Sequence, residues 1–275
     1  MNNPRFADLH IHTYYSDSTS SPKEVVDDAI KAQLSCIAIT DHDVIDGIVP
    51  VQQEAKMFDL EVIPGIELSS EIQGKDIHIL GYFMDIKHDP LLEKLDAIQQ
   101  ARFERMENMI MKLKGLGINN IEIEEVCALT KSRAVGRPHL AEVLKEKGWI
   151  KNIKEAFEKY IGEGSPAYYT KYNQTPYEAI KLIKESGGLA VMAHPMLTQK
   201  DELIKSFVEA GLDGLEVYYS NCSEVVVESY IKLAKKYKLL MTGGSDAHGT
   251  RKTFTYVGKR KIPYELVEKM KELKS

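Results

Sequence analysis

Six of the eight histidines lie inside or at the ends of short apolar runs that have the composition of β-strands. They are His10, His12, His42, His78, His194 and His248. Acidic residues stand in or beside the same runs, namely Asp17, Glu67 and Asp246. Imidazole nitrogens together with carboxylate oxygens suit Zn, Mn or Fe, whereas Ca and Mg prefer shells of oxygen alone. The pattern therefore predicts a site for divalent metal ions.

The spacing of His10 and His12 supports this prediction. Residues two apart on a strand point to the same side, so both imidazoles can bind one ion. A single strand histidine is more often a hydrogen-bonded core residue than a ligand. That explanation would require six histidines and three acids to occupy strand ends independently, so we prefer one shared site.

Seven apolar runs must position these residues. They are residues 7–13, 35–43, 61–70, 76–84, 188–195, 214–220 and 239–249. Amphipathic segments typical of helices lie between several of them, including 21–34, 176–186 and 223–237. Pro22 after Ser21, and Thr175 before the second segment, are signals for helix starts. We therefore expect an α/β fold of the barrel type, in which strand ends far apart in sequence converge.

Residues 91–164 interrupt this alternation, because they contain helix-like segments and no alternating strand. Apolar residues recur near helical spacing at Leu91, Leu95, Ile98, Met106, Ile110 and Leu113, and again at Trp149, Ile153, Phe157 and Tyr160. We predict an inserted helical subdomain at 91–164 that covers the active site. The barrel would then consist of residues 1–90 and 165–275.

Several basic residues of the insertion are candidates for binding an anion. Arg137 and His139 flank a proline at a predicted helix start, where free backbone N–H groups and a guanidinium suit phosphate oxygens. A structural salt bridge of Arg137 is the alternative. Arg102 and Arg105 lie three apart on a helix and face either the cleft or the solvent.

Composition narrows the class of protein. The formal net charge of −5 argues against a broad electrostatic grip on nucleic acid, although a nucleotide or short oligonucleotide is compatible with it. The three cysteines are far apart, which disfavours a disulfide framework. The first residues lack a leader pattern, and no window approaches the ~20 apolar residues that cross a bilayer. We expect a cytoplasmic protein without a membrane or stable protein partner.

The motifs DLHIHTYYSD, ITDHD, GIELSS, HILGY, AHP and GGSDAHG, taken in order, resemble the polymerase and histidinol phosphatase (PHP) family of metallo-phosphoesterases over nearly the whole chain. The segments VGRPHLAEVL and EAFEKYIGEGSPAYY look like the free-standing branch. That branch includes nucleoside 3',5'-bisphosphate phosphatases that also trim short RNA from the 5' end. The resemblance implies a distorted seven-stranded (β/α) TIM-like barrel with two to three divalent ions, Mn, Fe or Zn.

The resemblance also implies how the ligands divide among the ions. The first ion would be held by His10, His12, Glu67 and Asp246, the second by Glu67, His78 and His194, and the third by Asp17, His42 and His248. Glu67 would thus bridge two ions, and Arg137 and His139 would bind the substrate phosphate. Ser18 stands where many relatives have Gly, and Ala247 where many have Phe, which leaves the substrate's identity open.

The implied reaction is hydrolysis of a phosphomonoester by a hydroxide that bridges two ions. The residues expected to act in it are Glu67, Asp246, Arg137 and His139, with His139 positioning a phosphate or donating a proton. The small phosphorylated substrate would be a nucleoside 3',5'-bisphosphate, cleaved at its 3'-phosphate, or the 5' end of a short RNA. Alternatives are a histidinol phosphate phosphatase, a DNA 3'–5' exonuclease, and an inactive metal-binding module. An inactive module would lack ligands, and none is missing.

Overall fold

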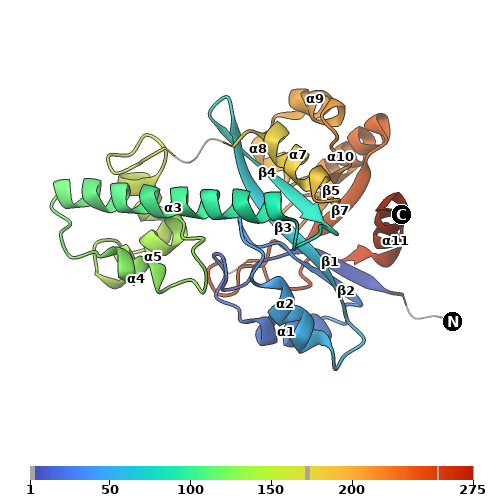
Figure 1. The fold of residues 1–275 in the computed structure, drawn as a ribbon, viewed down its shortest axis with the longest axis horizontal. Coiled ribbons are helices and arrows are strands. Elements are labelled where there is room, and N and C mark those ends of the chain that lie inside the picture. Colours follow the sequence, from blue (N-terminus) through green and yellow to red (C-terminus); the bar gives the residue numbers. More distant parts are fainter. Residues whose placement is uncertain (1–3, 171–173, 253, 275) are drawn as a thin grey trace.

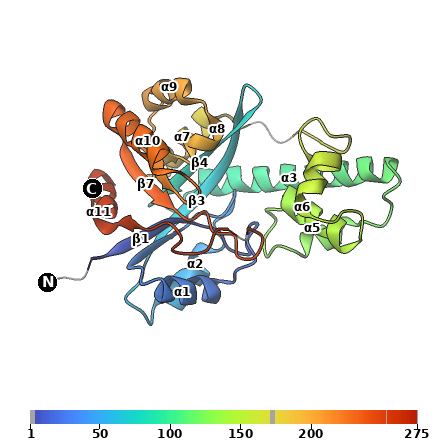
Figure 2. The same ribbon diagram turned by 180° about the vertical axis from the view of Figure 1, so that it is seen from behind.

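The computed structural model of the protein describes residues 4–170, 174–252 and 254–274. All seven predicted strands form, and a short eighth strand joins them. The strands are β1 (Phe6–Ile11), β2 (Cys36–Ile39), β3 (Glu61–Ile72), β4 (Lys75–Tyr82), β5 (Leu189–Met192), β6 (Gly214–Tyr219), β7 (Leu240–Gly244) and β8 (Ile262–Pro263). They form one sheet in the order β7-β6-β5-β4-β3-β2-β1-β8. The sheet curls into a nearly closed barrel (Figures 1 and 2).

The sheet closes on itself where the end of β1 lies beside the residues that follow β7. The His12 N–H donates to the Ala247 carbonyl at 3.1 Å. The buried carboxylate of Asp8 on β1 accepts from the N–H groups of Ser245 and Gly258, both at 2.8 Å. This seam brings the histidine motifs that follow β1 and β7 together.

One strand runs against the expected direction. β4 pairs antiparallel with both β3 and β5, whereas β1, β2 and β3 are mutually parallel, as are β5, β6 and β7. β3 and β4 form a hairpin whose two turn residues, Gln73 and Gly74, have φ of 52° and 69°, the positive values that such a turn requires. The expectation of repeated β/α units is therefore wrong here. Because β4 is reversed, His78 near its start lies at the end of the barrel where β2 ends.

Helices cover the outside of the barrel. They are α1 (Pro22–Lys31), α2 (Ile48–Ala55), α7 (Pro176–Glu185), α8 (Pro195–Thr198), α9 (Ile204–Glu209), α10 (Glu224–Tyr237) and α11 (Tyr264–Lys274), with a 3₁₀ turn η2 (Asp201–Leu203). α1 and α7 begin as predicted, because Ser21 and Thr175 each form a capping box with the glutamate three residues later. α1 and α2 lie on one side of the sheet and α7 to α10 on the other (Figures 1 and 2).

Between β4 and α7 the chain forms a separate helical region. It contains α3 (Asp89–Gly115), α4 (Ile123–Cys127), α5 (Arg137–Glu146), α6 (Ile153–Ala156) and a turn of π-helix, η1 (Phe157–Ile161). Apolar residues of 106–167 form a hydrophobic cluster of their own, whereas Leu91 and Leu95 at the start of α3 pack into the barrel's cluster. α3 therefore extends from the barrel into the insertion, which projects to one side of the sheet (Figure 1). The boundaries at 91 and 164 stay a prediction.

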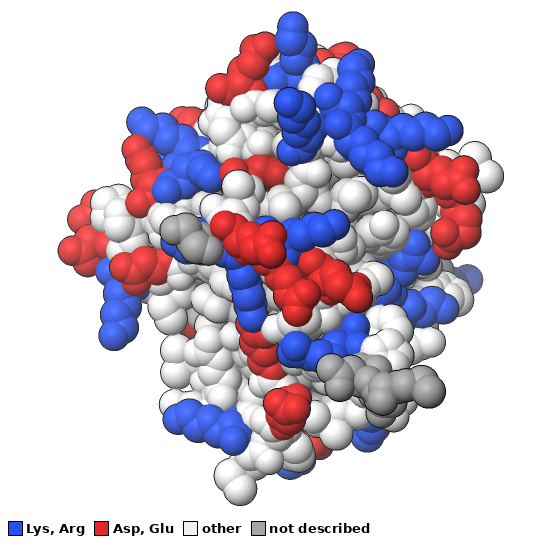
Figure 3. All heavy atoms as spheres, turned by 90° about the vertical axis from the view of Figure 1, so that its right-hand side faces the viewer, with Lys and Arg blue, Asp and Glu red and all other residues white. Residues whose placement is uncertain are grey.

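The surface carries both signs of charge. On the face drawn in Figure 3, Lys and Arg side chains are interspersed with Asp and Glu side chains. None of the helices in residues 4–170, 174–252 and 254–274 combines the length and apolarity that a bilayer crossing requires.

Candidate metal centre

The nine predicted ligand residues converge at one end of the barrel. They are His10 on β1, His12 and Asp17 after it, His42 after β2, Glu67 on β3, His78 on β4, His194 after β5, and Asp246 and His248 after β7. The most exposed of these side chains, His78, is only 21% exposed. The structure thus brings together every residue that the sequence predicts as a ligand.

Glu67 lies at the centre of this cluster. Its Oε1 lies 2.8 Å from His78 Nδ1 and 3.0 Å from His194 Nε2. Its Oε2 lies 3.2 Å from one nitrogen of each of three other imidazoles, those of His10, His12 and His42. The two carboxylate oxygens face two different sets of imidazoles, which is the geometry that a bridging carboxylate needs.

The first group of ligand atoms contains His10, His12, Glu67 and Asp246, whose ligand atoms all lie within 4.8 Å of one another. The Nε2 atoms of His10 and His12 are 3.1 Å apart. Asp246 Oδ1 lies 3.6 Å and 3.3 Å from these two nitrogens. These are the four residues expected at the first ion.

The second group contains His42, Glu67 and His78. The sequence prediction gave this position His194 and placed His42 at another ion. In the structure both imidazoles lie beside Glu67, His194 at Oε1 and His42 at Oε2. His42 therefore stands between two groups.

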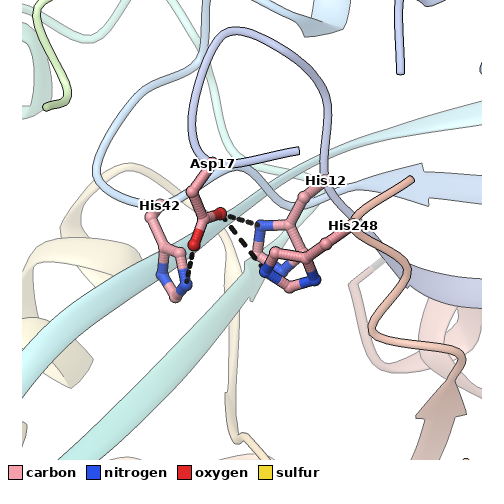
Figure 4. A group of neighbouring side chains, drawn as sticks. All are labelled: His12, Asp17, His42 and His248. Atoms are coloured by element: carbon pink, nitrogen blue, oxygen red, sulfur yellow. Dashed lines mark ion pairs between the residues drawn. The ribbon is translucent and has the colours of Figure 1, made fainter. Parts of the chain in front are cut away.

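The third group contains His12, Asp17, His42 and His248. Its three imidazoles surround the Asp17 carboxylate (Figure 4). Asp17 Oδ1 lies 3.2 Å from His248 Nε2 and 3.8 Å from His12 Nδ1, and Oδ2 lies 3.9 Å from His42 Nε2. His12 therefore turns Nε2 to the first group and Nδ1 to the third.

Three buried atoms of the third group have no hydrogen-bond partner. They are His12 Nδ1, Asp17 Oδ1 and His248 Nε2. Buried polar atoms of native proteins are nearly always paired, and a cation would pair all three at once. Neutral imidazoles and carboxylates are the donors that Mn, Fe and Zn accept. The residues present therefore fit divalent metal ions.

The carboxylates of the site are held in the charged form that binds a cation. Burial alone would raise the pKa of Glu67, but the neighbouring imidazoles hold that pKa well below its usual range. The same balance lowers the pKa values of Asp17 and Asp246. Burial lowers the pKa of His12, but the carboxylates of Asp246 and Glu67 outweigh burial and raise it to about 9. A metal ion bound there would displace this proton.

A pocket opens beside the second and third groups. It is lined on the barrel side by residues that include Asp17, His42 and His78, and on the insertion side by residues that include Arg102, Arg105, Arg137 and Phe157. Arg105 Nη2 is buried without a hydrogen-bond partner. Burial, and then the charge of Arg137, lower the pKa of Arg105 to about 10. Guanidinium groups crowded in this way favour a bound anion.

The three arginines use their donors differently, although all line the pocket. Arg102 Nε donates to Asp43 Oδ2 at 2.9 Å, and its Nη2 donates to the same oxygen and to Ser69 Oγ. Arg137 makes a longer ion pair of 3.8 Å with Asp76. Arg102 is therefore engaged within the protein, whereas Arg105 and Arg137 are better placed to bind a ligand.

Known proteins match this chain over nearly its whole length. The family model described as "PHP domain" matches residues 8–274. The chain belongs to the PHP domain family. This PHP domain is 33% identical to the "5'-3' exoribonuclease Rnm" of Escherichia coli (strain K12) over 248 residues, 88% of this chain and 84% of that protein.

Two further relatives agree with this membership. This PHP domain is 29% identical to the "3',5'-nucleoside bisphosphate phosphatase" of Chromobacterium violaceum, over 88% of this chain and 86% of that protein. It superimposes with a TM-score of 0.88 on a Bifidobacterium adolescentis protein described as a metal-dependent phosphoesterase, at 28% identity and over 98% and 96% of the two chains. The protein is accordingly a metal-dependent hydrolase of phosphoester bonds. The resemblance inferred from the motifs and the barrel fold are both confirmed.

Glu216 of β6 is a residue of this PHP domain that the sequence reasoning missed. It is completely buried. Its Oε1 lies 2.9 Å from His10 Nδ1, and its Oε2 accepts from the His194 N–H at 2.8 Å. A carboxylate on the outer nitrogen of a ligand histidine fixes which nitrogen faces the metal. The signal for Glu216 was available, because a lone acid stands inside the apolar run GLEVYYS.

Asp246 also has partners that were not predicted. Tyr219 Oη and Lys252 Nζ both donate to Asp246 Oδ2, each at 2.8 Å. These bonds leave Oδ1 directed at the first group. Lys252 follows the last histidine motif in a polar segment, RKTFTY, where nothing in the sequence distinguishes it from a surface lysine.

His139 of the PHP domain lies where the predicted phosphate contact cannot form. The ring is completely buried. Its Nδ1 accepts from the Gly136 N–H at 3.0 Å, and its Nε2 donates to the Ser16 carbonyl at 3.0 Å. Both nitrogens are thus engaged within the protein, and the described residues that line the pocket include Arg137 but not His139. In this structure His139 positions the loop before Asp17 instead.

Proposed function

We propose that this PHP domain removes the 3'-phosphate of nucleoside 3',5'-bisphosphates and trims short RNA from the 5' end. The observation that carries the proposal is the pocket, in which Arg105 and Arg137 share one space with Asp17, His42 and His78. A substrate with two phosphates on one ribose suits such a site. One phosphate can lie at the metal groups while guanidinium groups bind the other bidentately.

We further propose that two to three divalent ions, Mn, Fe or Zn, act in the reaction. The first position would be held by His10, His12, Glu67 and Asp246, the second by Glu67, His78 and His194, and the third by Asp17, His42 and His248, since a neutral His12 has one nitrogen free for an ion. Such ions, when bound, lower the pKa of coordinated water and neutralise charge on phosphate oxygens.

The chain's own groups bind and orient the substrate in this proposal. Arg105 and Arg137 hold the phosphate that does not react. The Phe157 ring also lines the pocket, and the Arg137 guanidinium lies over this ring at 5.5 Å from its centroid, so the ring helps to place that cation. Lys252 Nζ, on a side chain that is 46% exposed, places a cation next to Asp246 and balances the charge of the reacting phosphate.

Several observations favour this proposal over its alternatives. The names of two relatives, an exoribonuclease and a bisphosphate phosphatase, point to nucleotide substrates. A net charge of −5 disfavours an exonuclease that tracks along long DNA. An inactive module is disfavoured because the nine ligand residues lie together. Histidinol phosphate stays as the alternative monoester.

The test is hydrolysis by the Mn-loaded protein, measured as release of inorganic phosphate from the monoesters and of mononucleotide from the oligoribonucleotide. The panel contains adenosine 3',5'-bisphosphate, adenosine 3'-phosphate, AMP, histidinol phosphate and a 5'-phosphorylated oligoribonucleotide, with chelated enzyme as the blank. We expect the bisphosphate and the oligoribonucleotide to react fastest. Preference for histidinol phosphate would overturn the substrate, and no release from any compound would favour the inactive module.

A variant separates binding of the second phosphate from the chemistry. Arg137→Ala removes one charge-assisted contact, which costs about 1.5–3 kcal/mol. We therefore expect the KM for the bisphosphate to rise by about 10- to 100-fold. The KM for adenosine 3'-phosphate should change much less. Lys145→Ala, which removes an exposed cation of the same helix α5, is the matched control. Equal effects of Arg137→Ala on both substrates would contradict the assignment of Arg137.

A further inference from the structure

We infer that the insertion assembles the third metal position, defined by the ligand atoms of Asp17, His42 and His248. An ion would then bind there tightly only while the insertion is docked on the barrel. The inference rests on the proposed metal dependence and deepens it, because it states which part of the chain controls one ion. Each of the three loops that bring ligands to this position has its own contact with the insertion.

The loop that carries Asp17 is held through its backbone carbonyls. The His139 Nε2–H donates to the Ser16 carbonyl at 3.0 Å. The Ser132 hydroxyl donates to the Tyr15 carbonyl. Because both donors belong to the insertion and the acceptors directly precede Asp17, the insertion restrains this loop in addition to the barrel residue Asp41, which accepts from the Ser16 hydroxyl.

His42 is fixed through the next residue, Asp43. Arg102 of α3 donates to the Asp43 carboxylate through Nε and Nη2, and Gln99 of α3 donates to its backbone carbonyl at 3.1 Å. The buried carboxylate also accepts from the Ser69 N–H of β3 at 2.8 Å. The turn that carries His42 is therefore clamped between the barrel and α3.

The turn that carries His248 is tied to α5 through Arg251. Arg251 Nε and Nη2 donate to Glu142 Oε2 at 3.0 Å and 2.7 Å. The Arg251 side chain is 9% exposed and the Glu142 side chain 26%, so solvent screens this pair less than a pair on the open surface. The Arg251 N–H also donates to the His248 carbonyl at 3.3 Å, which links the ion pair to the ligand turn.

The other ligand positions are held within the barrel. Glu67 and His78 stand in strands that pair along their length. The His194 N–H and the Asp246 carboxylate are bound by the β6 residues Glu216 and Tyr219. Loosening the insertion should therefore disturb the third position most, because the second group shares only His42 with it.

The test begins with Glu142→Arg, which places a second guanidinium against Arg251. Residues that support metal ligands without binding the ion typically contribute about 10- to 100-fold to metal affinity. We expect the affinity for one Mn²⁺ to fall by that factor, measured by calorimetric titration of the full chain, while the remaining ions bind as in wild type. Anomalous scattering from Mn-loaded crystals should show that the missing ion is the one beside Asp17.

Two matched variants exclude general destabilisation. Glu146→Arg makes the same charge change on an exposed residue one turn further along α5 and should keep every ion. The exchange Glu142→Arg with Arg251→Glu restores an ion pair of opposite orientation and should recover the affinity. A helix damaged by the substitution alone would not be rescued in this way.

Ser132→Ala gives a second, milder test on another loop. It removes one of the two hydroxyls that bind the Tyr15 carbonyl, leaving that of Thr130, without a change of charge. We expect the same ion to be weakened, and no further loss when Ser132→Ala is added to Asp17→Asn, since Asp17→Asn already removes a ligand of that ion.

The outcomes distinguish this inference from the proposed function. Equal weakening of all ions, or metal content unchanged in both Glu142→Arg and Ser132→Ala, would overturn the inference. So would a wild-type protein that releases phosphate from the panel but binds no more than two ions, although the proposed function would stand. Selective loss of the third ion in a protein that releases no phosphate would support the inference and overturn the proposed function.

Discussion

Glu67 connects the two sides of the metal centre, because each of its carboxylate oxygens faces different imidazoles. In Glu67→Gln one oxygen becomes an NH₂ group, which repels a cation. We expect kcat of the Mn-loaded protein to fall by at least about 100-fold. Loss of a ligand should cost more than the loss of a residue that only hydrogen-bonds to a ligand. Glu71→Gln, four residues along β3, is the matched control. A wild-type rate in Glu67→Gln with the metals retained would refute the bridging role.

His139 should make the stability of the folded protein depend on pH. Burial, and then the charge of Arg251, lower the pKa of His139 from 6.5 to about 4. The unfolded chain therefore takes up a proton at higher pH than the folded chain. The stability that neutral His139 provides is complete above pH 6.5 and is lost as pH falls toward 4.

The loss can be measured against His139→Gln. Between about pH 7.5 and pH 5 the wild type should lose about 2 kcal/mol more of its unfolding free energy than the variant. Urea unfolding with a chelator present measures this difference without a contribution from metal release. Equal losses would mean that His139 is protonated in the folded protein.

At the scale of single residues, the sequence predicted which residue types act as ligands but not how these ligands divide among the metal positions. His12 and His42 each stand between two groups, and which nitrogen faces which carboxylate depends on side-chain rotamers that no spacing encodes. Glu216 could have been found, because a buried carboxylate inside an apolar strand needs a partner. Lys252 could not, because its role depends on where the loop after β7 folds back.

At the scale of elements, the seam between β7 and β1 tolerates no side chain at Gly244. A Cβ there would lie against the backbone nitrogen and the Cβ of His10. Gly244→Ala should therefore destabilise the protein by about 1–3 kcal/mol, the usual cost of overpacking. It should also weaken metal binding, because the first group straddles this seam. Both effects can be measured by urea unfolding and by calorimetric titration with Mn²⁺.

The control for this prediction is Gly115→Ala, at the end of α3. A Cβ at Gly115 meets nothing within 4 Å, and Ala favours the helix over Gly by up to about 1 kcal/mol. We expect this variant to be neutral or slightly more stable. A loss equal to that of Gly244→Ala would show that the seam is not responsible.

The strands themselves were predictable because each is a short apolar run with turn residues at its ends. The direction of β4 was missed because we read one strand after another as β/α units. The predicted runs 61–70 and 76–84 are separated by only five residues, which leaves no room for a crossover helix and should have indicated a hairpin, whose turn is formed by Gln73 and Gly74. β8 was missed because two residues carry no periodicity.

At the scale of the whole molecule, the barrel carries the metal ligands and the insertion contributes the arginines of the pocket. The helices between β4 and α7 were predictable because the apolar spacing changes from strand-like to helical after β4. The docking of the insertion was not, because the contacts of Ser132, Arg102 and Glu142 with barrel loops join residues far apart in sequence. The same contacts place the arginines of the insertion in the pocket beside the metal groups.

Metal ions should therefore stabilise the molecule as a whole, because they join loops that come from many strands. Ions present at about 100 times their dissociation constant contribute about 2.7 kcal/mol, and chelation should lower Tm by about 5–10 °C in a domain of this size. Added Mn²⁺ should restore Tm, measured by calorimetry, whereas Mg²⁺ at the same concentration should restore much less, because six of the nine ligand side chains are imidazoles. Full recovery with Mg²⁺ would mean that the carboxylates alone hold the ions. An unchanged Tm after chelation would mean that the ligand loops are ordered by the insertion and the strands without any metal.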